Sequence, residues 1–151
     1  MKNTQHSEVE AIKWAAYRNT TFRAYVHGQQ FDIKIGKCHP VLDIVLQQYK
    51  ATAWAFITAS NPAGQCLPDN ENMRRNEELS KLLKTISKAE KVVKYDGEGI
   101  PDTGDWKPEK SYLVIGITHP EARSLGKKFG QDAIVWGSAG KKARLVSLVQ
   151  K

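Results

Sequence analysis

The sequence of 151 residues has few cysteines and histidines and no long apolar run. Nothing in it approaches the length of about 18 apolar residues that a membrane-spanning helix needs. The N-terminus, MKNTQHSEVEAIKW, lacks the apolar stretch of a signal peptide. Cys38 and Cys66 have neither metal-binding nor redox spacing. We therefore expect a cytoplasmic protein with reduced thiols and no membrane partner.

Motifs for metal binding and catalysis are also missing. The four histidines are scattered and define no acid–base pair. The acidic residues between Asp96 and Glu109 do not follow the spacing of an EF-hand loop. Ser111 lacks the Gly-x-Ser-x-Gly context of an activated nucleophile. We expect neither a metal nor a cofactor, and the sequence leaves open whether the protein is an enzyme.

The apolar pattern that is present predicts a single α+β domain over residues 1–151. A chain of this length with 40% apolar residues can bury one core. Two β-like runs at 21–26 and 29–35, separated by His27-Gly28, predict a hairpin. The mostly apolar run at 52–59 predicts a central strand covered on both faces. Further strands are expected at 91–95, 111–117, 132–137 and 143–149, with a loop at 96–108.

Helix signals lie between these strands. Ser7 and Glu10, and again Thr118 and Glu121, have the spacing of a capping box. Pro40 suits the first turn of a second helix. A helix over 68–88 has a buried stripe of Leu79, Leu82, Leu83 and Ile86. These features together predict a mixed β-sheet with three or four helices packed on it.

Polar residues interrupt the apolar patterns where the central strand ends and where the long helix begins. Asn61-Pro62 directly follows the strand. The leucine stripe, extended towards the helix N-terminus, meets Asn72, Arg75 and Asn76. An arginine near a core is costly without a partner. Arg75 is therefore expected to pair with a carboxylate or to face a pocket at the positive end of the helix dipole.

Two later segments offer polar partners. Glu109 and Ser111 share one side of an extended chain, and Glu109 is the best carboxylate to meet Arg75. Gln131 stands just before a strand. The predicted ligand site comprises Asn61, Asn72, Arg75, Asn76, Glu109, Ser111 and Gln131. The alternative is structural, with Asn61 bonding its own loop and Arg75 binding Glu109.

Five segments in this order carry a family resemblance: YRNTTFRAYV, FITASNP, NMRRNEELSKLL, WKPEKSYLVIGI and FGQDAIVW. The set resembles the bacterial domain-of-unknown-function family 3293, from Tyr17 to about Leu148. The resemblance implies one compact domain. It also adds weight to Asn61, Asn72, Arg75, Glu109, Ser111 and Gln131 as one polar set. It implies no activity.

The net charge of +7 permits a polyanionic partner. Basic residues gather along and after the long helix and near the C-terminus, at Lys81, Lys84, Lys88, Lys91, Lys94, Lys141, Lys142 and Arg144. No known nucleic-acid-binding motif accompanies them.

Three functions are consistent with the sequence. The first is binding of an anionic ligand, a nucleotide or nucleic-acid end, in the predicted polar site. The second is a hydrolase or phosphodiesterase with Glu109 as general base. The third is a protein-interaction or inhibitor module of a mobile element that uses its basic surface.

Overall fold

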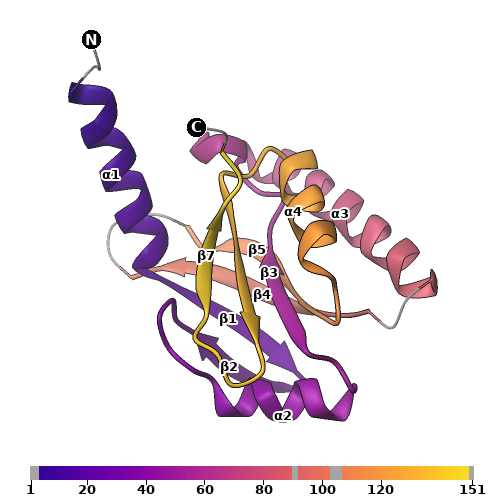
Figure 1. The fold of residues 1–151 in the computed structure, drawn as a ribbon. Coiled ribbons are helices and arrows are strands. Elements are labelled where there is room, and N and C mark those ends of the chain that lie inside the picture. Colours follow the sequence, from indigo (N-terminus) through magenta and orange to yellow (C-terminus); the bar gives the residue numbers. More distant parts are fainter. Residues whose placement is uncertain (1–3, 90–91, 103–106, 150–151) are drawn as a thin grey trace.

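The computed structural model describes residues 4–89, 92–102 and 107–149, with only the backbone described at 4–10 and 88–89. Seven strands and four α-helices alternate irregularly along this part of the chain (Figure 1). Their order is α1 (Thr4–Arg18), β1 (Thr20–Val26), β2 (Gln29–Ile33), α2 (Pro40–Gln48), β3 (Ala53–Ile57), a 3₁₀ turn (Pro62–Gly64), α3 (Asp69–Ala89), β4 (Val93–Pro101), β5 (Glu109–Ile115), α4 (His119–Lys128), β6 (Ala133–Ser138) and β7 (Arg144–Ser147). None of the described helices has the length and apolarity to cross a bilayer.

The strands form one sheet in the order β2-β1-β4-β5-β3-β6-β7. Every neighbouring pair is antiparallel. The predicted α+β domain is therefore confirmed, whereas the predicted mixed sheet is wrong. Strand β3 lies inside the sheet between β5 and β6, as its continuous apolar run predicts.

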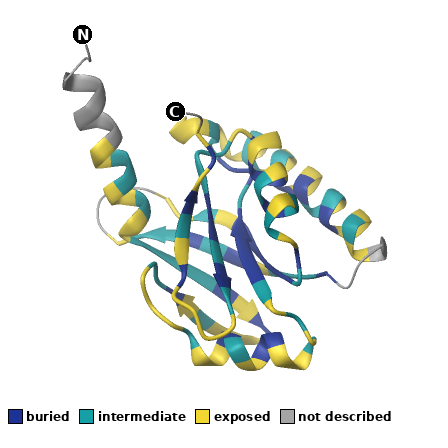
Figure 2. Ribbon diagram, in the orientation of Figure 1, coloured by how far each residue is buried: buried dark blue, intermediate teal, exposed yellow. Residues whose placement is uncertain are grey.

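Each face of the sheet has its own core. Helices α3 and α4 cover one face, where Leu79, Leu83 and Leu125 pack on Ala55 and Val114. Helix α2 covers the other face, where the core includes Leu42, Leu46, Trp54, Phe56 and Leu113. Figure 2 shows buried residues running through the sheet between these helices, while α1 extends away from it. The alternation of side chains along β3 and β5 supplies both cores.

The sheet curls, so that its first and last strands approach each other beyond their ends. The amide of Gly36, after β2, donates to the carbonyl of Ala143 at 2.7 Å. The amide of Ala143, just before β7, donates to the carbonyl of Lys37 at 2.9 Å. These two bonds satisfy backbone groups that would otherwise lie at open sheet edges.

Several predicted boundaries need correction. The Thr118–Glu121 capping box is confirmed in α4. Helix α1 begins at Thr4, so Ser7 lies inside the helix and does not cap it. The predicted loop 96–108 is wrong in its first part, because β4 continues to Pro101 and pairs with both β1 and β5.

Candidate functional site

The antiparallel sheet brings three chain segments to one edge. Strand β3 ends where β5 and β6 begin, because both neighbours run in the opposite direction. Helix α3 starts near the same edge and packs on the sheet. Six of the seven predicted site residues lie here and form what we call the polar cluster, namely Asn61, Asn72, Arg75, Asn76, Glu109 and Gln131.

Asn61 is at the centre of the polar cluster, as its place after β3 predicts. Its Oδ1 accepts from the amide of Leu67 at 2.9 Å and from Nδ2 of Asn72 at 2.8 Å. Its Nδ2 donates to Oε1 of Glu109 at 3.0 Å, and its own amide donates to Oδ1 of Asn72 at 2.9 Å. Asn61 therefore links the loop after β3 to α3 and to β5.

Asn76 holds the same loop one turn further along α3. It is 2% exposed, so its amide group must find partners inside the protein. Its Oδ1 accepts from the amide of Ala59 at 2.9 Å, and its Nδ2 donates to Oγ of Ser60 at 2.8 Å. Nε2 of Gln131 donates to the carbonyl of Ser60 at 2.9 Å and to that of Phe129 at 3.3 Å. Side chains from α3 and from the residue two positions before β6 thus bond the chain at 59–60.

Arg75 and Glu109 do not form a direct ion pair, which was one of the arrangements expected for Arg75. Nε of Arg75 donates to the carbonyl of Ala59 at 2.6 Å, and its Nη2 donates to the carbonyl of Phe129. The guanidinium also lies 5.9 Å from the centre of the Phe129 ring. Main-chain carbonyls replace the carboxylate, because the ends of β3 and α4 meet beside this helix face. Arg75 joins these two ends.

Glu109 is half-buried and has one polar partner in the described part of the chain, the Nδ2 group of Asn61. Burial raises the pKa of the Glu109 carboxyl, and the bond from Asn61 opposes this only in part. A raised pKa brings a carboxyl closer to the range useful for proton transfer near neutral pH. Within the polar cluster, Glu109 is therefore the candidate for proton transfer.

Ser111 does not join the polar cluster. It is 2% exposed, and its Oγ donates to the carbonyl of Glu109 at 3.1 Å. Leu113 and Ile115, which alternate with the same phase along β5, belong to the core under α2. Ser111 therefore lies on the opposite face of the sheet from α3.

The loop held by the polar cluster has an unusual backbone. Asn61 and Ala63 adopt left-handed conformations with φ of 46° and 54°, and Gly64 follows with φ of 76°. Such angles are costly for alanine and persist only where surrounding contacts enforce them. The amide of Ala63 bonds the carbonyl of Gly130 at 2.9 Å, which fixes the loop from its other side. The bonds of the polar cluster thus serve first to hold this loop in one shape.

Two surface cavities lie away from the polar cluster. One is lined by residues of α3 and β4, including Leu83, Lys84 and Lys94. The other is lined by residues near the end of α2, at the start of α4 and in β6, including Tyr49, His119 and Trp136. Neither cavity includes a member of the polar cluster.

A group of basic side chains lies where the curled sheet closes. Lys37, Lys141, Lys142 and Arg144 are exposed, and we call them the basic surface. The bonds between residues 36–37 and Ala143 bring Lys37 beside the other three. Within the described residues, no carboxylate lies at ion-pair distance from these four side chains. Sequence reasoning missed Lys37, because no pattern signals a contact that depends on the curl of the sheet.

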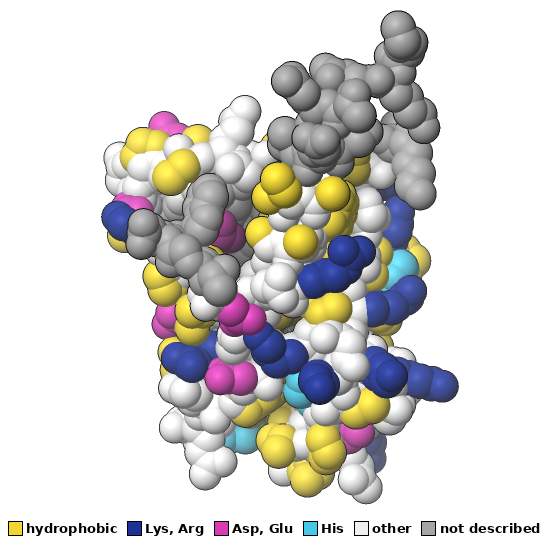
Figure 3. Space-filling model, turned by 90° about the vertical axis from the view of Figure 1, so that its left-hand side faces the viewer, with side chains coloured by type: hydrophobic (Ala, Val, Ile, Leu, Met, Phe, Trp, Pro, Cys, Tyr) yellow, Lys and Arg dark blue, Asp and Glu magenta, His cyan; other side chains and the backbone are white. Residues whose placement is uncertain are grey.

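Charge is unevenly spread over the side of the molecule drawn in Figure 3. Lysine and arginine side chains gather in its middle and right-hand parts, whereas acidic side chains lie mainly at the left. The predicted lysines along α3 are a separate group, with Lys81 and Lys84 exposed on that helix. Lys91 and the side chain of Lys88 lie outside the described part of the chain.

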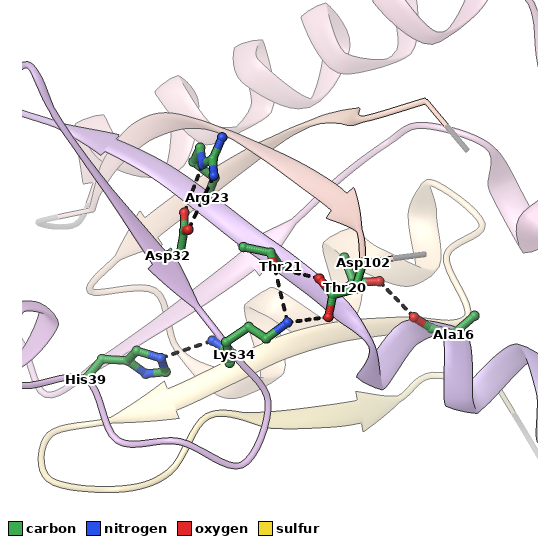
Figure 4. A network of polar contacts seen from close by, with 8 residues as sticks. All are labelled: Ala16, Thr20, Thr21, Arg23, Asp32, Lys34, His39 and Asp102. Carbon is green, nitrogen blue, oxygen red and sulfur yellow. Dashed lines mark hydrogen bonds and ion pairs between the residues drawn. The ribbon is translucent and has the colours of Figure 1, made fainter. Parts of the chain in front are cut away.

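Other basic groups in this region are already paired (Figure 4). Arg23 donates to Asp32 through Nε at 2.9 Å, across the hairpin of β1 and β2. Lys34 binds the carboxylate of Asp102, which also accepts from Oγ1 of Thr21 at 2.7 Å. The pKa of Asp102 is lowered, first by the bond from Lys34 and then by that from Thr21. These contacts tie the sheet edge together. Arg23 and Lys34 therefore differ from the four cations of the basic surface, which have no carboxylate partner among the described residues.

Comparison with known proteins identifies the family of this chain. A family model described as "Protein of unknown function (DUF3293)" matches residues 57–134. The match runs from the last residue of β3 to the start of β6 and includes every member of the polar cluster. No curated protein and no solved structure matches the chain. Because the matched segment covers more than half of the sequence, the chain belongs to the DUF3293 family.

Proposed function

We propose that the protein binds nucleic acid through the basic surface. The observation that carries the proposal is a group of four exposed cations without carboxylate partners among the described residues. Cations that are not paired within the protein keep their full attraction for phosphate. Backbone bonds between the two sheet ends hold Lys37 next to residues 141–144, so the charge is concentrated in one place.

Phosphate contacts of this kind release counterions and bind without reading sequence. The excess of basic over acidic side chains, +7 in total, supports a polyanionic partner. Cys38 and Cys66 are free and exposed, which suits the reducing cytoplasm. We therefore infer a cytoplasmic protein whose affinity for nucleic acid depends strongly on salt and weakly on base sequence.

The test compares two triple variants that remove the same charge. Lys141→Ala, Lys142→Ala and Arg144→Ala together change the basic surface, whereas Arg74→Ala, Lys81→Ala and Lys84→Ala change exposed positions of α3. Binding of a labelled single-stranded oligonucleotide is measured at several salt concentrations. The proposal predicts a large loss for the first triple variant and a small loss for the second. Equal losses would show that net charge alone attracts the oligonucleotide.

The same four cations could instead bind an acidic protein, and a competition experiment distinguishes the two partners. If polyglutamate displaces the oligonucleotide at equal charge concentration, the basic surface is a docking site for acidic proteins and the nucleic-acid proposal fails. If the oligonucleotide is retained, phosphate is the preferred anion.

A second candidate function rests on Glu109. Its raised pKa and its single bond to Asn61 favour a proton-transfer role in a hydrolase or phosphodiesterase, with ligand bound at the polar cluster. Glu109→Gln preserves the bond from Asn61 but removes the titratable group. Loss of a phosphodiesterase activity in this variant, without loss of stability, would support the catalytic function. An activity that persists would exclude Glu109 as its general base.

A further inference from the structure

The cavity near the end of α2 has a volume of about 380 Å³. The residues that line it include Tyr49, Lys50, Thr52, Thr118, His119 and Trp136. We call it the Trp136 cavity. Ligand cavities in proteins span about 300–1,000 Å³, so this one suits a small ligand of one or two rings.

Three of the ten residues that line the Trp136 cavity are aromatic, namely Tyr49, His119 and Trp136. The His119 imidazole meets the Trp136 indole edge-to-face, with ring centres 4.8 Å apart and an interplanar angle of 86°. Trp136 is half-buried and packs on the core under α3 and α4, which holds the indole in place. Such an arrangement presents a rigid apolar surface to a flat ligand.

His119 contributes as a neutral ring. Its Nε2 is buried without a hydrogen-bond partner among the described residues. Burial lowers the pKa of His119, and the nearby charges of Arg144 and Arg123 lower it further. The protonated form of His119 is therefore disfavoured, and the neutral imidazole is available for ring contacts.

Cations lie beside the same cavity. Lys50 lines it and is exposed, and no ion pair of Lys50 occurs in the described part of the chain. Arg144 belongs to the basic surface and is the cross-strand neighbour of Trp136 in the β6–β7 pair. Its charge lowers the pKa of His119. The cavity thus combines aromatic side chains with the positive charge of Lys50 and of Arg144, and only Arg144 belongs to the basic surface.

We propose that the Trp136 cavity accepts a nucleobase, with its ring against Trp136 and His119 and its phosphate near Lys50 and Arg144. The inference rests on the proposed function, since it names the part of a nucleic acid that this region takes up. Aromatic contact is tolerant of base identity, because every base has a π-face. The cavity would therefore hold one unpaired base while the basic surface binds the neighbouring phosphates.

The experiment uses three small probes with the full chain, namely adenosine, AMP and ribose 5-phosphate, followed by calorimetry or by NMR of the indole N–H groups. We expect adenosine to bind, AMP to bind more tightly, and ribose 5-phosphate to bind far more weakly than either. Ribose 5-phosphate binding as tightly as AMP would overturn the inference, since the ring would then contribute nothing.

Variants locate the probe. Trp136→Leu should lower the affinity for adenosine about 5- to 150-fold, the range that one stacked base represents. Trp136→Phe keeps a ring and should retain most of the affinity, and Met73→Ala, exposed on α3, should change nothing. Unchanged adenosine binding in Trp136→Leu would refute the assignment. Lys50→Glu, at an exposed position, should weaken AMP and spare adenosine even if Trp136→Leu fails to fold.

Failure of the nucleobase inference can be distinguished from failure of the proposed function. Adenosine carries no charge, so its binding tests the cavity without the basic surface. If adenosine does not bind while oligonucleotide binding stays salt-dependent, only the nucleobase inference fails. If adenosine binds but the basic-surface variant keeps its oligonucleotide affinity, the proposed function fails instead.

Discussion

Replacing Asn61 by alanine tests how much of the polar cluster is structural. The change removes three bonds of the Asn61 side chain, to Leu67, Asn72 and Glu109, with lengths of 2.8 to 3.0 Å. It also places an alanine at φ 46° and ψ 65°, a left-handed conformation that asparagine tolerates better. Both effects act on the same half-buried loop.

The expected magnitude follows from these contacts. A typical hydrogen bond contributes about 1 kcal/mol to the free energy of unfolding. The left-handed conformation adds about 1 kcal/mol for alanine. Because the loop can relax and admit water, we expect a total loss of about 2–4 kcal/mol. For a chain of this length that lowers the melting temperature by about 4–16 °C.

Circular dichroism of thermal unfolding, supported by urea titration, measures the loss. Asn61→Gly is the matched variant, since it removes the same bonds but accepts the left-handed angles, and it should be about 1 kcal/mol more stable than Asn61→Ala. Oligonucleotide affinity, measured well below the melting temperature, should stay at the wild-type value in both. A melting temperature within about 1 °C of wild type for Asn61→Ala would refute the structural reasoning. Loss of ligand binding at unchanged stability would favour the polar cluster as a ligand site.

Two further predictions concern stability. Glu109 has a raised pKa, so ionisation costs more in the folded than in the unfolded protein, and stability falls as pH rises above the unfolded pKa of about 4.3. Urea titrations should therefore show that Glu109→Gln is more stable than wild type at pH 8 and about as stable as wild type at pH 4. An equal increase in stability at both pH values would contradict the raised pKa of Glu109. In Gly137→Ala the new Cβ would clash with the Trp54 ring. We therefore expect the free energy of unfolding to fall by about 1–3 kcal/mol. An unchanged midpoint in urea titration would show instead that Trp54 can move aside.

Much of the fold follows from local sequence patterns. The stripe of Leu79 and Leu83 predicts the buried face of α3, and the Thr118–Glu121 spacing predicts the start of α4. The polar residues that precede the stripe predict a meeting of α3 with the end of β3, which the bond between Asn61 and Asn72 confirms. These features need only neighbours three or four residues apart, or one short connection.

Other features depend on contacts that are distant in sequence. The sequence places Gly97 in a predicted loop, yet it lies within β4. A Cβ at this position would lie 2.7 Å from the carbonyl oxygen of Arg23 and 2.8 Å from the Phe56 ring, so only glycine fits. Close packing, rather than a turn, accounts for the glycine. Arg75 was expected to pair with a carboxylate or to face a pocket, but two main-chain carbonyls bind it. Carbonyls occur at every residue, so no sequence pattern identifies them as partners.

The salt dependence of oligonucleotide binding tests the central claim most directly. For a single strand, the slope of log K against log salt changes by about 0.7 for each phosphate contact. The Lys141→Ala, Lys142→Ala and Arg144→Ala variant should therefore bind more weakly, with a slope shallower than that of wild type by about 2. The matched triple variant of α3 should keep the wild-type slope. An unchanged slope in the first variant, or binding that survives high salt in it, would contradict nucleic-acid binding through the basic surface.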